Sequence, residues 1–163
     1  MDFMAEARAD EARARQIFDV CDADRDGVLG RAEYAEFLRR VALDVTGLPP
    51  KPKEVRTFLM DRRASRTKRE ELVERLIGGA EFVDFWTNKW SDLLLVNRNF
   101  LGPEGAKALS DWVRQQVASN VAYDKFVYSV LATSGSTLKN PPAAYYKVLR
   151  EPEVAMENTT QLF

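Results

Sequence analysis

The segment DADRDGVLGRAE, from Asp22 to Glu33, constrains what this chain can fold into more than any other stretch. It places three aspartates at alternate positions, a glycine directly after the third, and a glutamate at its end. Carboxylates this close together repel one another when nothing lies between them. The segment therefore predicts that a cation binds among these side chains.

The spacing of these residues is that of an EF-hand calcium loop, which joins two helices. The predicted metal ligands, in loop order, are Asp22, Asp24, Asp26, Val28, Gly30 and Glu33. Val28 needs to supply only its backbone carbonyl, a water would act at Gly30, and Glu33 can bind through both carboxylate oxygens. Gly27 can adopt the positive φ that the sharp turn requires. The predicted cofactor is Ca²⁺.

Two alternatives to a calcium site stay open. Magnesium could compete, although a loop that wraps several oxygens and ends in glutamate favours calcium over an ion that demands a rigid octahedron. The segment could also be a solvated, aspartate-rich turn that caps the next helix and binds nothing tightly.

The residues around the loop suit a pair of helices. Ile17 and Phe18 precede it, and the apolar residues of 34–38 follow it, so both helices would carry an apolar inner face. No second loop of this kind occurs, although EF-hands usually pair. Leu29 should then contact a second EF-hand from another chain, residues missing before the N-terminus, or another element of this chain.

Apolar residues recur at helical spacing along the chain, and no segment shows the alternation of a strand. The predicted fold class is all-α, with a single EF-hand helix-loop-helix that continues into a multi-helix domain. The expected helices cover about 3–21, 31–45, 54–61, 68–77, 80–96, 104–118 and 123–131, followed by two short helices. Thr67 is expected to cap the helix of 68–77, and residues 97–103 are expected to form a loop.

Composition excludes several classes of chemistry. The chain has no histidine and one cysteine, Cys21, which excludes histidine-based catalysis, internal disulfides and Cys-x-x-Cys sites within these residues. A net charge of −1 gives no reason to expect nucleic acid as a partner. No apolar run is long enough for membrane insertion, and no signal peptide is visible. Residues 51–76 carry nine basic and five acidic side chains, which favours solvated helix faces over a polyanion site.

From about Glu36 onward the sequence resembles a known family. The resemblance rests on EFLRRVALDVTGLPPKPKEVRTFL, REELVERLIGGAEFVDFWTNKWSDLLLV, LGPEGAKALSDWVRQQVASNVAYDKFVYSVL, TSGST, NPPAAYYKVLREPE and ENTTQLF. These stretches resemble the helical domain of unknown function of planctomycete-type cytochrome-associated surface proteins. The resemblance implies an extracytoplasmic or cell-surface location and a Cys-x-x-Cys-His haem-attachment segment after ENTTQLF. No residue up to Phe163 matches that segment, so we expect the chain to be a fragment of a longer protein.

Together these features predict an EF-hand helix-loop-helix over residues 1–40 and an all-α domain, truncated at its C-terminus, over 41–163. The function expected of it is calcium binding by a non-catalytic structural or interaction module. The alternative is that this chain is the N-terminal helical part of a larger cytochrome-like redox or enzymatic surface protein. A third interpretation is a purely structural helical domain with an idle acidic loop.

Overall fold

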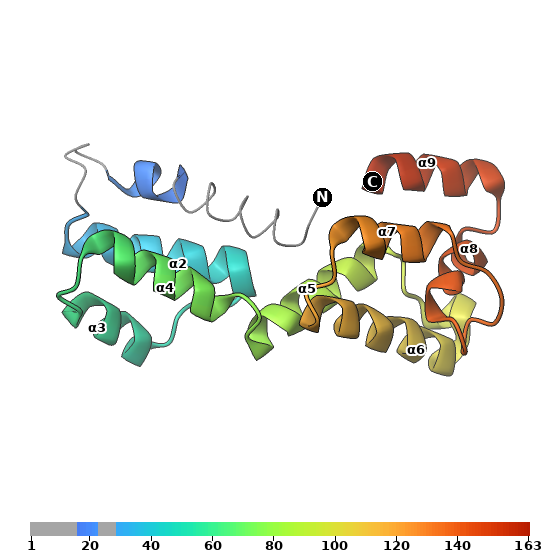
Figure 1. The fold of residues 1–163 in the computed structure, drawn as a ribbon, viewed down its shortest axis with the longest axis horizontal. Coiled ribbons are helices and arrows are strands. Elements are labelled where there is room, and N and C mark those ends of the chain that lie inside the picture. The colour runs from blue at the N-terminus through green and yellow to red at the C-terminus, as the bar shows by residue number, and fades with distance from the viewer. Residues whose placement is uncertain (1–15, 23–28) are drawn as a thin grey trace. The chain divides into compact units, whose positions relative to one another are not determined.

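The computed structural model describes residues 16–22 and 29–163, and every regular element in these ranges is helical (Figure 1). The predicted all-α class is confirmed for this part of the chain. The expected first helix is described only over residues 16–21, because residues 3–15 lie outside the described part. The chain divides into two compact units, with the boundary between Phe85 and Trp86.

The unit that ends at Phe85 contains residues 16–21 and the helices α2 (Arg31–Thr46), α3 (Pro52–Met60) and α4 (Ser65–Leu76). Helix α2 ends because Gly47 adopts a left-handed φ of 69°, and its N–H closes the helix on the Leu43 carbonyl at 2.9 Å. The proline pair that follows cannot continue a helix. Helices α3 and α4 both pack against α2 (Figure 1).

One apolar core holds this unit together. Its buried members are Cys21, Leu29, Phe37, Leu38, Val41, Val45, Phe58, Leu72 and Val73. Helix α2 contributes every third or fourth residue to it, as an amphipathic helix does. Partly buried apolar residues of the 16–21 helix, including Ile17 and Phe18, pack against the same core. The two segments that flank the acidic loop therefore share a core with α3 and α4.

The prediction that Thr67 caps a helix is wrong, because α4 begins at Ser65, three residues before the expected start at Lys68. The N–H of Lys68 already donates to the Ala64 carbonyl at 3.2 Å, so Thr67 lies inside the first turn. A tight turn makes the early start possible: the backbone N–H of Arg63 donates to the Asp61 carboxylate at 2.9 Å directly after α3.

Helix α5 (Ala80–Leu93) crosses the boundary between the units. The unit that begins at Trp86 continues with α6 (Arg98–Ala118), α7 (Tyr123–Leu131), the short 3₁₀ helix η1 (Pro141–Ala143), α8 (Ala144–Leu149) and α9 (Pro152–Leu162). Helix α6 packs against η1 and α8 (Figure 1). The ring of Phe126, which is fully buried, lies 4.9 Å from that of Trp90 and 5.3 Å from that of Trp112, centroid to centroid.

The predicted loop over residues 97–103 instead contains the N-cap residue Asn97 and one helical turn, which a non-helical residue at Gly102 separates from the rest of α6. The Asn97 side chain accepts the Asn99 N–H at 2.7 Å and so caps a helix that begins at Arg98. The glycine and proline still interrupt the helix: Gly102 adopts a φ of 73° and kinks it before Pro103. Within the described parts of the chain, no helix is both long and apolar enough to span a bilayer.

Candidate metal site

The acidic segment lies between residues 16–21 and α2, and the structure describes its two ends. Asp22 is 8% exposed, and its N–H donates to the Phe18 carbonyl at 2.8 Å, so the residue continues the hydrogen bonding of the preceding helix. A buried carboxylate is costly unless hydrogen bonds or a metal ion compensate it. Asp24, Asp26 and Val28 lie outside the described residues.

At the other end of the segment, Gly30 and Glu33 form the start of α2. Gly30 is the N-cap residue in extended backbone, and its N–H donates to Glu33 Oε2 at 2.6 Å. A Cβ at Gly30 would lie 3.1 Å from that oxygen, so glycine leaves the room that the carboxylate occupies. The Glu33 carboxylate is thus directed back toward the loop rather than along the helix.

Leu29, between the two ends, is 3% exposed and belongs to the core shared with α3 and α4. The sequence left open whether Leu29 contacts a second chain, residues before the N-terminus or another element of this chain. The structure shows contacts with other elements of this chain. The neighbouring Cys21 is 6% exposed, and burial raises the pKa of its thiol. A thiol kept protonated is a poor metal ligand, because metals bind the thiolate.

Helix α4 contacts both flanks of the segment through two consecutive basic residues. Lys68 places Nζ 3.8 Å from the ring centroid of Tyr34, the residue after Glu33. Arg69 places its guanidinium carbon 4.0 Å from the ring centroid of Phe18, on the helix before the segment. Cation–π contacts of this kind hold an aromatic residue on each side of the loop against one helix.

Glu36, the next acid on α2, is engaged elsewhere. Its carboxylate accepts hydrogen bonds from Arg39 at 2.8 and 2.9 Å and from Arg40 at 2.8 Å. These guanidinium groups lower the pKa of Glu36 to about 2. Glu36 is therefore engaged by arginines and adds no ligand to the predicted set. The acids of that set that the structure describes are Asp22 and Glu33.

No group of three or more acidic, cysteine or histidine side chains that could hold a metal gathers in residues 16–22 and 29–163. Two of the four predicted carboxylate ligands, Asp24 and Asp26, fall outside that search. The described residues therefore offer no second place for a cation of this kind.

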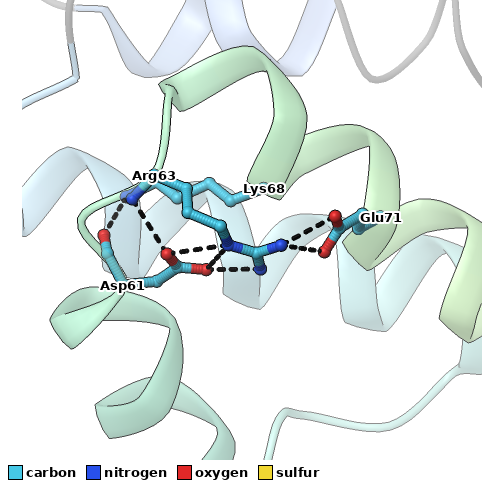
Figure 2. Close-up of polar contacts among 4 residues, drawn as sticks. All are labelled: Asp61, Arg63, Lys68 and Glu71. Carbon is cyan, nitrogen blue, oxygen red and sulfur yellow. Dashed lines mark hydrogen bonds and ion pairs between the residues drawn. The ribbon is translucent and has the colours of Figure 1, made fainter.

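Sequence reasoning missed a polar cluster between α3 and α4, which Figure 2 shows. Arg63 pairs with Asp61 at 2.6 Å and with Glu71 at 2.7 Å, and Lys68 lies beside them. The interpretation of residues 51–76 as solvated faces is wrong for Lys68, which is 7% exposed. The excess of basic residues was a signal, but periodicity does not reveal which lysine is buried.

Comparison with known proteins places the chain in a family without assigning it an activity. No curated protein and no solved structure matches the sequence. The family described as PSCyt2, protein of unknown function (DUF1549), matches residues 15–161, a range that includes the acidic segment. Because the match covers about nine-tenths of the 163 residues, the chain belongs to the PSCyt2 family, a family of unknown function.

Proposed function

We propose that this chain binds one calcium ion through the loop from Asp22 to Glu33 and serves as a non-catalytic structural module. The observation that carries the proposal is the position of Glu33 at the start of α2, with Oε2 2.6 Å from the Gly30 N–H. The last ligand of an EF-hand loop is a bidentate glutamate, and Glu33 at the start of the following helix has that position. Asp22, the first predicted ligand, lies at the other end of the loop, directly after the helix of residues 16–21.

In this proposal the other ligands are Asp24, Asp26, the Val28 carbonyl and a water at Gly30, which complete the oxygen set that calcium prefers. Binding would draw the Glu33 carboxylate from the Gly30 N–H toward the ion. It would also tie the helix of residues 16–21 to α2 at a point where the core already brings them together. Calcium would thus add stability to the whole unit that ends at Phe85.

A structural role is favoured over a signalling role because the inner face of the helix pair is already covered. Calcium sensors open their helices and expose an apolar groove for a target. Here Leu29, Phe37 and Leu38 share a closed core with Phe58 of α3 and Leu72 of α4. Opening that face would expose the core of the unit, which makes it a costly surface to offer to a partner.

The test compares Glu33→Gln with Glu54→Gln. Glu54 has the same place in α3 that Glu33 has in α2, and it accepts the Lys51 N–H at 2.8 Å, far along the chain from the loop. Both substitutions remove one charge and keep an oxygen for the cap. We expect calcium to raise the melting temperature of the parent and of Glu54→Gln, by a stabilisation of about 2.7 kcal/mol at 100 times the dissociation constant. Glu33→Gln should lose most of that response, and an unchanged response would refute the assignment.

The second candidate function is that of a helical part of a larger, surface-associated cytochrome-like protein. The name of the PSCyt2 family favours it, since it points to a cytochrome-associated surface domain. A longer reading frame with Cys-x-x-Cys-His after Phe163, expressed with haem maturation, should show a c-type haem spectrum. A calcium response without any such segment in the gene would favour the binding module alone.

A further inference from the structure

Lys68 is a buried ammonium group in an apolar setting. The residue is 7% exposed, and its Nζ lies 3.8 Å from the ring centroid of Tyr34 and 5.0 Å from that of Phe58. The two rings come from α2 and α3, and the lysine from α4. An ammonium ion taken out of water needs a counter-charge and hydrogen-bond acceptors, or its burial is strongly unfavourable.

The protein supplies only part of that compensation. An ammonium carries three N–H donors. Lys68 donates one hydrogen bond, to the Asp61 carbonyl at 3.4 Å, which exceeds the usual range of about 2.7–3.2 Å. Among the residues that the structure describes, no carboxylate oxygen pairs with Lys68 within 4.0 Å. The contact with Asp61 at the end of α3 satisfies one donor, and within the described residues the ammonium has no direct ion pair.

The acids that Figure 2 draws beside Lys68, Asp61 and Glu71, both pair with Arg63. Asp61 accepts two side-chain hydrogen bonds at 3.0 Å from Arg63 Nε and one at 2.6 Å from Nη2, and Glu71 accepts two at 2.7 Å from Nη1 (Figure 2). Arg63 also holds the pKa of Asp61 at about 2, so this carboxylate stays ionised as the partner of the guanidinium. Arg63 thus pairs with both acids, and Lys68 lies beside this cluster without a direct ion pair to either carboxylate.

Lys68 lines a pocket of about 330 Å³ between α3 and α4. Phe58 and Leu72 form apolar parts of its wall, and the exposed Lys53 and Arg75 are also among the lining residues. The charged lining residues are four cations (Lys53, Arg63, Lys68 and Arg75) and three acids (Glu54, Asp61 and Glu71). Four cations against three acids leave the pocket lining with one excess positive charge.

We propose that this pocket binds an oxyanion group, the phosphate, sulfate or carboxylate of a small solute, with Lys68 as its buried counter-ion. Lys53 and Arg75 attract the anion from the exposed part of the pocket, and Lys68 provides the N–H donors that the protein leaves over. The volume lies at the lower end of the range for small-molecule sites, about 300–1,000 Å³, which fits an anionic group with a small attached body. The site is separate from the calcium loop and does not depend on it.

The experiment titrates the metal-free, desalted protein with sodium phosphate, sodium sulfate and sodium acetate, each against sodium chloride at equal ionic strength. The melting temperature and the heat of binding are followed for the parent, Lys68→Met, Arg75→Gln and the control Lys107→Met. Lys107 is an exposed lysine that pairs with Asp111 on α6, so its variant removes a charge without touching the pocket.

We expect at least one oxyanion to give a saturable response in the parent and in Lys107→Met, with an affinity about tenfold lower in Lys68→Met. The anion that gives this response shows whether the pocket prefers a phosphate, a sulfate or a carboxylate group. The absence of saturation with all three anions would overturn the proposal, and so would an unchanged affinity in Lys68→Met. If Lys68→Met does not fold, the double variant Lys53→Gln/Arg75→Gln decides. Lys53 and Arg75 are both exposed, so replacing them should not prevent folding. An oxyanion affinity of the double variant equal to that of the parent would refute the site.

Discussion

Gly47 ends α2 at a point where α5 leaves no room for a side chain, and Gly47→Ala tests this contact. Gly47 has a φ of 69°, and a Cβ built there would lie 2.3 Å from Phe85 Cδ2 and 2.6 Å from Cε2. Carbon atoms in van der Waals contact are about 3.5–4.0 Å apart. The Phe85 ring would therefore have to move by more than 1 Å, or the end of α2 would have to shift away from it.

Two terms set the size of the effect. The left-handed backbone costs a residue with a Cβ about 1–2 kcal/mol. Displacing a packed ring costs about 1–3 kcal/mol. The free energy of unfolding should therefore fall by about 2–5 kcal/mol, to be measured by urea denaturation followed by circular dichroism.

The matched control is Gly78→Ala. Gly78 has a similar φ of 77°, but no atom lies within 4 Å of a Cβ built on it. It should show the backbone cost alone, about 1–2 kcal/mol. Gly47→Ala should cost less stability in a Phe85→Ala background than in the parent, since the overlap is then gone. The argument fails if Gly47→Ala destabilises the protein no more than Gly78→Ala does.

Two further predictions address the polar cluster and the second unit. The pKa of Asp61, about 2 in the folded state, lies below its ordinary value of 3.8, so its contribution to stability is present above pH 4 and is lost as pH falls toward 2. Melting temperatures measured from pH 7 to pH 2 should therefore fall less steeply below pH 4 for Asp61→Asn than for the parent, and parallel curves would contradict the pairing with Arg63. Phe126→Ala should lower the free energy of unfolding by about 3–5 kcal/mol, because its fully buried ring packs against Trp90 and Trp112. Tryptophan fluorescence in a urea titration measures this loss, and a cost below about 1 kcal/mol would contradict the packing.

Sequence reasoning was most reliable where local signals and tertiary structure agree. The expected helix of 31–45 matches α2 closely, because Gly47 and the following prolines stop it for local reasons. It failed at Thr67, where the capping-box pattern is present but a turn closed by Asp61 starts the helix earlier. It also failed for part of residues 97–103, predicted to form a loop, where the Asn97 side chain caps a helical turn before the kink at Gly102.

The candidate sites show the same limit. The acidic loop was visible because its predicted ligands follow one another in sequence at fixed spacing. The Lys68 pocket was not, because Tyr34, Phe58 and Lys68 come from three helices and meet only in the folded unit. The burial of Leu29 also depends on contacts with α3 and α4. The residues around the loop do not predict these contacts.

The most direct test of the central proposal is an isothermal titration of the chelator-stripped protein with calcium, repeated in excess magnesium. The proposal predicts one calcium ion per chain, binding that survives magnesium, and loss of the signal in Glu33→Gln. Half a calcium ion per chain would instead indicate pairing with a second EF-hand from another chain. The absence of both heat and a shift in melting temperature would contradict the proposal and leave Asp22–Glu33 as a solvated turn.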